Sequence, residues 1–404
     1  MSNRSFAYLV PQFPGQTHIF FWREIAALEA QGVTPVLYST TVPPAGLISH
    51  HWSDDAMART TYLASRNPAL LAAILPRLPW GSILREARLM PKDEAKTFLK
   101  DVIISAPAAE KLARDCKQKG ISHIHAHSCG RAALIAALAH HAHGLSYSLT
   151  LHGPLQDYGV GQRFKWQGAA FASVITRALL DLLPNQLGDA LPARLPLQPM
   201  GVDTSAFRRD TPYLPPGPGE PLRVFSCGRL NVVKGHQDLM QAVRLMLDQG
   251  QPVQLEIAGE DDAGGTGYRA ELQQHIIELG LEAHVTLLGA ISAVAVREKL
   301  MAAHAFVLAS WSEPLGVAYM EAMSCEVPTI GTNAGGVPEL ITSGKDGVLV
   351  PPKDPKALAA ALMHLASHPD VAVALAQAGR ARVVAEFDSS RGADMLIREI
   401  WQES

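Results

Sequence analysis

The sequence predicts an α/β protein with two Rossmann-like domains, each a doubly wound parallel sheet. Three observations predict this fold class. The chain has 404 residues, which is too long for one typical core. Short apolar runs alternate with helical periodicity along most of it, as expected for parallel strands joined by helices. A stretch rich in Pro and Gly, Leu214–Pro221, separates two such series.

Composition indicates a globular protein and argues against several functional classes. Hydrophobic residues make up 48% and charged residues 18% of the chain, which allows two buried cores without extensive disorder. The net charge of −3 argues against a dedicated nucleic-acid binder. The four cysteines lack CxxC spacing and are expected to be buried thiols in a reducing cytoplasm. No apolar run reaches bilayer length, so we expect a cytoplasmic protein, soluble or peripheral to the membrane.

The first strand–helix–strand unit lies at the N-terminus. Phe6–Val10 is predicted as a buried strand, Phe20–Gln31 as a helix and Val33–Tyr38 as the next strand. This order indicates a right-handed parallel unit, whose ligands are expected at the carboxyl ends of the strands. The loop Pro11–Thr17, which carries Gly15, lies at one such end.

Residues 52–100 differ from this pattern. Arginines and lysines alternate there with leucines, isoleucines and Trp80. Such a segment could lie on an anionic membrane surface. It could equally be a solvated helical pair packed on the sheet, and the sequence leaves both interpretations open.

The alternation resumes with a strand at Ile121–His127, a helix at Arg131–His143 and a strand at Ser146–Gly153. Each strand ends at a histidine, His127 and His152. A lone histidine is more often structural than catalytic. Two at successive strand ends, where this fold class places its ligands, favour a functional interpretation.

Domain boundaries follow from the remaining pattern. A helix and a short strand are expected within Phe164–Leu180, and a strand and turn at Gln198–Phe207. Leu214–Pro221 is interpreted as a linker, after which strand–helix units repeat from LRVFSCGRL onwards. We predict an acceptor-binding domain at 1–205, a donor-binding domain at 206–385 and a C-terminal helix at 386–404 that returns to the first domain. The ligand cleft is expected between the two domains.

The stretch Ser310–Glu339 carries two acids, Glu313 and Glu321, around a predicted helix start. Pro314 suits the first helical position, so Glu313 is expected in the preceding loop and Glu321 two turns inside the helix. An anion could bind the free N–H groups of Leu315, Gly316 and Val317. Carboxylates for sugar hydroxyls beside amides for phosphate indicate a sugar-nucleotide site. The alternative is an amphipathic helix with a solvated acidic edge.

A second group follows the strand that ends at Ser226. The loop SCGRLNVVKG offers Gly228, Arg229, Lys234 and Gly235. Arginine and lysine five residues apart could clamp a diphosphate and stabilise the charge that develops on it. Two solvent-facing cations are the alternative interpretation. The order of a Walker loop is absent, and so is any DxD or other metal-ligand cluster.

These motifs resemble those of a known family. GRLNVVKG, AGE, VTLLGAI, the stretch from Ser310 and DGVLVPP are similar to the donor domain of the retaining glycosyltransferases of family 4, which have the GT-B fold. FPGQTHIFFWREI, HIHAHSCGRAALIAA, SLTLHG and PMGVD resemble the exopolysaccharide branch, which includes colanic acid and amylovoran glycosyltransferases. The resemblance covers nearly the whole chain and is loosest at 49–100.

The resemblance implies a role for each matched residue. Arg229 and Lys234 would hold the donor diphosphate, Glu313 the transferred sugar and Glu321 the ribose. His127 would face the donor sugar from the first domain. Main-chain groups near the donor would be those of Gly15, Gly228, Gly289, Leu315, Gly316 and Val317. The first loop has one glycine, Gly15, where many members carry two.

The expected activity is retaining transfer of a sugar from a UDP- or GDP-sugar to a glycan hydroxyl, with no metal and no other cofactor. The acceptor would be a lipid-linked oligosaccharide in exopolysaccharide or other surface polysaccharide biosynthesis. Two alternatives stay open at this point. One is a sugar-nucleotide epimerase or phosphorylase on the same fold, and the other is an inactive scaffold in a polysaccharide assembly complex.

Overall fold

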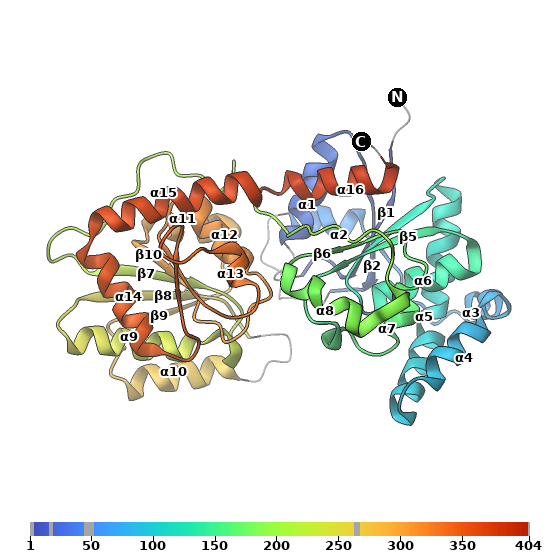
Figure 1. Ribbon diagram of the computed structural model, residues 1–404, viewed down its shortest axis with the longest axis horizontal. Coiled ribbons are helices and arrows are strands. Elements are labelled where there is room, and N and C mark those ends of the chain that lie inside the picture. The colour runs from blue at the N-terminus through green and yellow to red at the C-terminus, as the bar shows by residue number, and fades with distance from the viewer. Residues whose placement is uncertain (1–3, 16–18, 44–51, 262–266, 403–404) are drawn as a thin grey trace. The chain divides into compact units, whose positions relative to one another are not determined.

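The computed structural model describes residues 4–15, 19–43, 52–261 and 267–402, and it divides the chain into two compact units (Figure 1). Unit 1 holds the described residues up to 43, residues 52–199 and the C-terminal segment from 392. Unit 2 holds residues 200–391. The chain therefore changes units at 199/200 and 391/392, where the sequence predicts 205/206 and 385/386.

Unit 1 contains a six-stranded sheet in the order β3-β2-β1-β4-β5-β6, and every neighbouring pair is parallel. This is the order of a doubly wound sheet, in which the strand order reverses between β1 and β4. The register places Ala7 beside both Val36 and Ile124. The strands are β1 (Ala7–Gln12), β2 (Val36–Thr41), β3 (Thr61–Tyr62), β4 (His123–His127), β5 (Ser146–Leu151) and β6 (Ala172–Val174).

Helices lie on both faces of this sheet (Figure 1). The apolar side chains of β1 and β4 are buried against them, as in a parallel sheet covered on both sides. The helices are α1 (Ile19–Ala30), α2 (Ser53–Arg59), α3 (Pro68–Ile74), η1 (Leu75–Arg77), α4 (Trp80–Arg88), α5 (Lys92–Gln118), α6 (Arg131–His143), η2 (Leu155–Tyr158), α7 (Gln162–Trp166), α8 (Arg177–Leu187) and η3 (Gly188–Ala190).

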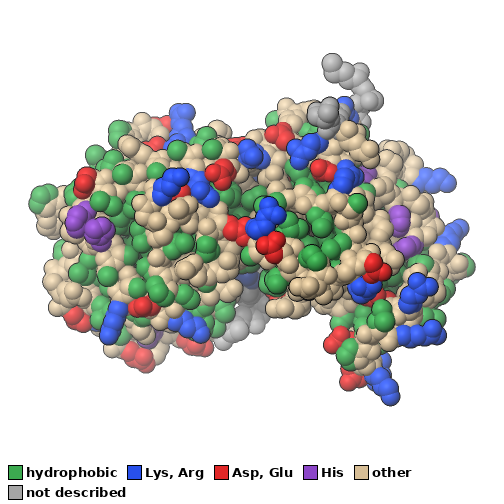
Figure 2. Space-filling view, viewed as in Figure 1, with side chains coloured by type: hydrophobic (Ala, Val, Ile, Leu, Met, Phe, Trp, Pro, Cys, Tyr) green, Lys and Arg blue, Asp and Glu red, His purple; other side chains and the backbone are tan. Residues whose placement is uncertain are grey.

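The segment 52–100 consists mostly of helices joined by short loops, and it contributes the edge strand β3. Its inner side chains are fully buried, and Phe98 of α5 packs edge-to-face on Phe164 of α7 with ring centroids 5.7 Å apart. Its outer side carries exposed Leu84 and Leu89 beside arginines and lysines. Figure 2 shows basic and acidic side chains together on this projection. The expected packing on the unit is thus present, and the surface remains amphipathic.

The last helix, α16 (Ser390–Trp401), belongs mostly to unit 1. Trp401 packs on Phe6 with ring centroids 6.1 Å apart, and Gln31 donates a hydrogen bond of 2.8 Å to Asp394. Arg194 pairs with Glu399 at 2.8 Å. These contacts join the C-terminus to the first sheet.

Unit 2 repeats the same topology. Its sheet has the order β12-β11-β10-β7-β8-β9, and all neighbouring strands are again parallel. The strand order, not the strand direction, reverses between β7 and β10. The strands are β7 (Leu222–Cys227), β8 (Val253–Ala258), β9 (Val285–Gly289), β10 (Ala305–Val307), β11 (Thr329–Thr332) and β12 (Val348–Val350).

Helices also cover both faces of this second sheet (Figure 1). Leu239, Val243 and Leu358 from two of them meet Leu255 and Ile257 of β8 in one buried cluster. The helices are η4 (Val232–Lys234), α9 (His236–Asp248), α10 (Tyr268–Glu278), α11 (Ala293–Ala302), α12 (Val317–Ser324), α13 (Val337–Leu340), α14 (Pro355–Ser367) and α15 (Pro369–Glu386).

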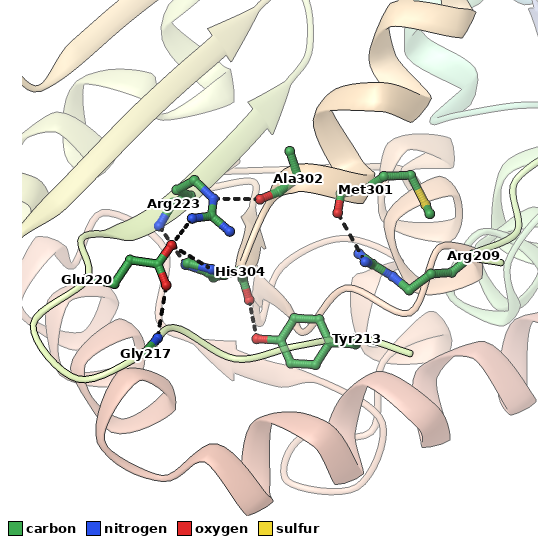
Figure 3. A network of polar contacts seen from close by, with 8 residues as sticks. All are labelled: Arg209, Tyr213, Gly217, Glu220, Arg223, Met301, Ala302 and His304. Atoms are coloured by element: carbon green, nitrogen blue, oxygen red, sulfur yellow. Dashed lines mark hydrogen bonds and ion pairs between the residues drawn. The ribbon is translucent and has the colours of Figure 1, made fainter. Parts of the chain in front are cut away.

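The Pro- and Gly-rich stretch is not a linker between the units. It lies inside unit 2, and its two ends are held by polar contacts (Figure 3). Tyr213 donates a 2.8 Å hydrogen bond to the carbonyl of His304. Glu220 accepts from the amide of Gly217 at 2.9 Å and pairs with Arg223. The stretch is therefore an irregular segment that packs on unit 2, because side chains at both of its ends bind partners in that unit.

One further expectation is wrong. Gln198–Phe207 forms no regular strand, and only isolated bridges such as Val202 with Asp388 occur near it. The helix Arg131–His143 has the bounds that the sequence predicts, and the last helix is shorter than the predicted 386–404.

Candidate functional site

The candidate site of unit 2 lies where the strand order of its sheet reverses. β7 and β10 are neighbours there, and their carboxyl ends lead into the loops 228–235 and 308–316. In doubly wound sheets this position opens a crevice between loops that run in opposite directions, and ligands bind there. The second group that the sequence singles out and Glu313 of the first are on these loops, and Glu321 lies in the helix that follows the loop 308–316.

The two loops are joined closely to each other. The amide of Trp311 donates a 2.7 Å hydrogen bond to the carbonyl of Val233. Trp311 also donates from its indole to Asp238 of α9 at 2.6 Å. Gly235 has a φ of +67°, and a Cβ added to it would lie 2.0 Å from the carbonyl oxygen of Ala309. Only glycine therefore permits this approach of the loops.

Lys234 and Glu313 form an ion pair across the junction, although 79 residues separate them in the sequence. Their side chains are 15% and 10% exposed, so water screens the pair only partly. Ser310 donates a further hydrogen bond of 3.2 Å to the same carboxylate oxygen. The structure thus brings together a cation and an acid that the sequence assigns to one ligand.

The main chain of Glu313 is held by the loop after β11. The amide of Gly336 donates to its carbonyl at 2.9 Å, and a Cβ on Gly335 would lie 2.1 Å from that oxygen. Sequence reasoning missed this support. The paired glycines of NAGG, which directly follow a strand, were the signal that could have found it.

The helix near Glu313 begins later than predicted. Helix α12 starts at Val317, with Gly316 before it at φ +92°, so Pro314 lies in the loop. A Cβ on Gly316 would lie 2.5 Å from the ring of Tyr319, which explains the glycine at this point. Glu321 consequently stands in the second turn of α12, not two turns inside it. In a helix that starts at Val317, the N–H groups with no partner inside the helix include that of Ala318. This residue lies beyond the predicted range Leu315–Val317.

Glu321 is buried, with 8% of its surface exposed. Burial raises the pKa of the nearby Cys227 thiol to about 12, and the negative charge of Glu321 adds to this shift while Lys234 opposes it. Both charges are therefore close to Cys227 at the end of β7. A second carboxylate accordingly lies in the same region as the ion pair of Lys234.

Arg229 is exposed on the first loop. Its main chain hydrogen-bonds the ring of His236, which is buried at the start of α9. Burial lowers the pKa of His236 to about 4, so the ring is neutral at physiological pH. The loop that presents Arg229 and Lys234 thus has an uncharged histidine beneath it.

The predicted glycines near the nucleotide lie along neighbouring strands. The amide of Gly228 donates to the carbonyl of Ala258 at 3.0 Å. Gly289 ends β9 with a φ of +76°, and its carbonyl accepts from Gly259 at 2.9 Å. These contacts bring the ends of β7, β8 and β9 to one edge of unit 2.

The predicted residues of unit 1 lie at the corresponding point of its sheet. His127 ends β4 beside β1, and Gly15 lies in the loop after β1, whose residues 16–17 are outside the described part. Gly15 and His127 are both buried. Nε2 of His127 lies 2.9 Å from Oε2 of Glu24, and its side chain is only 1% exposed. As placed here, His127 faces a carboxylate rather than the surface.

Among the described residues, no group of three or more His, Cys, Asp or Glu side chains could hold a metal ion. In the same part of the chain, no single helix is long and apolar enough to cross a membrane. Helices α14 and α15 pass that test only as a pair, and they are bent by 104° and bury their apolar side chains in unit 2.

Comparison with known proteins supports the motifs of unit 2. Residues 215–382 match the family model described as glycosyl transferases group 1. An amylovoran biosynthesis glycosyltransferase, AmsK of Erwinia amylovora, is 33% identical over 198 residues, which are 47% of this chain and 46% of that protein. The putative colanic acid biosynthesis glycosyltransferase WcaL of Salmonella typhimurium is 32% identical over 177 residues, 42% of each chain. The matches thus span about half the length of these relatives.

Solved structures extend the likeness to the whole fold. HepE of Anabaena, in complex with UDP and glucose, has a TM-score of 0.75 at 17% identity and covers 98% of this chain and 99% of its own. A sucrose-phosphate synthase from Thermosynechococcus elongatus has a TM-score of 0.73 at 21% identity, with 99% and 100% covered. At these identities the comparison establishes the two-domain GT-B fold.

Proposed function

Because residues 215–382 belong to the glycosyl transferases group 1, we propose that this chain is a retaining glycosyltransferase of family 4. It moves a sugar from a nucleoside-diphosphate sugar to a hydroxyl of a glycan acceptor. The observation that carries this proposal is the Lys234–Glu313 pair at the point where the second sheet reverses. A cation and an acid on adjoining loops suit a diphosphate and a sugar that are covalently joined.

The donor is proposed to bind unit 2. Lys234 and the exposed Arg229 contact the diphosphate, as a point charge and a two-pronged fork respectively. Glu313 accepts from hydroxyls of the transferred sugar, and Glu321 from the ribose. Amides from Leu315 to Ala318 contribute at the start of α12, where oriented N–H groups favour an anion. The nucleobase contacts the main chain around Gly289, and HepE in its complexes with UDP and UDP-glucose supports a nucleotide ligand for this fold.

The chemistry follows from charge. When the bond from the anomeric carbon to the diphosphate breaks, negative charge grows on the leaving oxygen. Arg229 and Lys234 stabilise this charge more strongly in the transition state than in the ground state. Lys234 must shift from Glu313 towards the phosphate, so donor binding also frees Glu313 to accept hydrogen bonds from sugar hydroxyls. No metal is assigned to the reaction, because these cations supply the positive charge.

The acceptor and location are proposed from the relatives and the surface of unit 1. Relatives named for amylovoran and colanic acid biosynthesis suggest a lipid-linked oligosaccharide in exopolysaccharide biosynthesis, at the cytoplasmic face of the membrane. Exposed Leu84 and Leu89 beside Arg85 and Arg88 would rest on anionic lipid there.

A transfer assay tests the activity. The protein is incubated with UDP- and GDP-sugars and a membrane lipid extract, with and without a chelator. We expect one donor to release its nucleoside diphosphate only when extract is present, at a rate unaffected by the chelator. Release without an acceptor would indicate another reaction, such as phosphorolysis. Absence of any thermal shift with UDP and GDP would favour a scaffold.

Vesicle binding tests the membrane contact separately. We expect sedimentation with vesicles containing anionic lipid at low salt and its loss at high salt, because screening removes the attraction. An Arg88→Glu variant should bind less, whereas Arg244→Glu on α9, which changes the net charge by the same amount, serves as the control. Equal binding by both variants would contradict the assignment to α4.

A further inference from the structure

Trp311 is the centre of a group of contacts that joins three strand-end loops of unit 2. Its amide donates a 2.7 Å hydrogen bond to the carbonyl of Val233, in the loop after β7. Its indole N–H donates to Oδ2 of Asp238 on α9 at 2.6 Å. Nζ of Lys353, in the segment after β12, lies 4.1 Å from the centroid of its ring. One residue of the loop after β10 thus contacts the loops that follow β7 and β12.

The backbone of Lys353 has a conformation that glycine adopts more easily. Its φ is +60°, in the left-handed region where a side chain adds a steric cost. Most residues with a positive φ in the described part of the chain are glycines. A lysine in this conformation is a reason to look for a use of its side chain. Among the residues that the structure describes, its ammonium forms no ion pair, and its contact is the ring of Trp311.

The charges around the indole of Trp311 are favourably placed. The face of an aromatic ring carries partial negative charge and attracts the ammonium of Lys353, whose stem also covers apolar surface. The indole N–H carries partial positive charge and binds the carboxylate of Asp238. Asp238 is only 8% exposed, so water competes little for this hydrogen bond. A cation and an anion therefore fix the orientation of the ring.

The position of Trp311 affects both parts of the candidate site. Ser310, the residue before it, donates to Oε2 of Glu313 at 3.2 Å. Val233, which accepts from the amide of Trp311, directly precedes Lys234. A displacement of Trp311 would consequently move the loop with Glu313 relative to the loop with Lys234.

We propose that Trp311 is a positioning residue for sugar transfer, with Lys353 and Asp238 as its clamp. It holds the loops after β7 and β10 at the separation at which Lys234 and Glu313 act on one donor. This inference rests on the proposed glycosyltransferase function. Trp311 acts through these loops and not by contact with the donor, because transfer depends on the exact placement of the groups that bind it.

The variant Lys353→Gly distinguishes positioning from stability. It removes the cation and also the left-handed strain, so we expect a melting temperature equal to or above that of the wild type. We expect kcat to fall by about 3- to 10-fold, within the range of indirect coupling effects. Lys353→Arg, which keeps a cation over the ring, should retain wild-type turnover.

The matched control is Glu326→Gly. Glu326 also has a positive φ, +52°, and it also makes a charge contact, at 3.6 Å from Arg380. It lies between α12 and β11, at the amino end of that strand, whereas the candidate site lies at the carboxyl ends. We expect Glu326→Gly to leave kcat unchanged.

Truncation of the ring should have a larger effect than removal of the cation. Trp311→Ala loses both the hydrogen bond to Asp238 and the surface that Lys353 covers. We expect kcat to fall by about 10- to 100-fold, because a misplacement of about 1 Å can cost that much.

Fluorescence gives a measurement that does not depend on turnover. Trp311 is the only tryptophan between residues 200 and 391, and its emission is obtained as the difference between a protein and its Trp311→Phe counterpart. Acrylamide is a neutral quencher, so its approach does not depend on charge. We expect it to quench this emission more in Lys353→Gly than in the wild type, because the ring loses its cover.

Wild-type turnover in Lys353→Gly would overturn the proposal, and so would an equal loss in Glu326→Gly or a loss in Lys353→Arg. A decrease in kcat that accompanies a lower melting temperature would assign Lys353 a purely structural role. Unchanged quenching would show that Lys353 does not hold the ring. Failure of the proposed function looks different, because the wild-type protein would then transfer no sugar and show no shift with UDP or GDP.

Discussion

The two units share one strand order but end their central strands in different chemical groups. In unit 2 the loops after β7 and β10 present Lys234, backed by the buried Glu313. In unit 1 the ends of β4 and β5 present His152, backed through His127 by the buried Glu24. Each site thus places a buried carboxylate behind a nitrogen group. The difference is that one nitrogen group is the ammonium of a lysine and the other is the imidazole of a histidine.

This difference matches the ligands that the proposal assigns to the units. A diphosphate needs positive charge, which a lysine provides at every physiological pH. A neutral hydroxyl needs only a hydrogen-bond partner, which an imidazole provides. The same sheet topology therefore serves two chemistries, because only the residues at the strand ends decide which ligand is bound.

Removing the cation of unit 2 should have the largest effect. We expect Lys234→Ala to lower kcat by about 10²- to 10³-fold, the usual loss when one charge-stabilising group is removed. Steady-state transfer rates check this. Lys299→Ala is the control, since Lys299 also pairs with a glutamate, Glu256 at 2.6 Å, but on α11. Unchanged turnover in Lys234→Ala would refute the diphosphate role.

The close approach of the two loops gives the next prediction. Gly235→Ala should lower the free energy of unfolding by about 2–4 kcal/mol, because it adds left-handed strain and a clash with Ala309. Gly250→Ala isolates the strain, since Gly250 has a φ of +78° with open space around it. It should cost only about 1 kcal/mol. Denaturant titration compares them, and equal losses would contradict the packing argument.

Glu313→Gln should affect sugar transfer more than nucleotide binding. The variant loses a charged hydrogen bond to the sugar worth about 1.5–3 kcal/mol, which corresponds to a decrease in kcat of about 10- to 100-fold. The Kd for free nucleoside diphosphate should change much less, since Glu313 is assigned to the sugar. Calorimetry and kinetics on the same preparation give both values. Parallel losses in both would count against the sugar-facing role.

Acid should weaken both units through buried histidines. Burial lowers the pKa of His123 in β4 and of His236 in α9 to about 4, from 6.5 in the unfolded chain. The unfolded state therefore binds more protons between these values, and stability falls as the pH falls from 6.5 to 4. Between pH 7 and pH 5 each histidine should cost about 1–2 kcal/mol.

Denaturant melts at several pH values check this direction. His123→Gln should flatten the pH dependence of the unfolding free energy, because one of the buried histidines with a lowered pKa no longer titrates. A slope equal to that of the wild type would show that other groups cause the acid loss.

Periodicity was enough to predict most of the fold. The α/β alternation predicted both parallel sheets, since buried strands and amphipathic helices differ in the spacing of their apolar residues. Arg131–His143 was predicted to the residue. Leu214–Pro221 was misread because Pro and Gly indicate an irregular course but not what it packs on. Tyr213 and Glu220, which fix it to unit 2, find their partners only in the folded chain.

What the sequence by itself determined was the kind of chemistry in unit 2: Arg229, Lys234, Glu313 and Glu321 stand beside recognisable strand ends and glycines. Only the tertiary structure decided which groups meet. Lys234 reaches Glu313 because β7 and β10 are neighbours, and His127 is withdrawn from the surface because Glu24 arrives from α1. The physical reason is that side-chain type is local, whereas burial and partnership depend on strand order, which joins residues far apart along the chain.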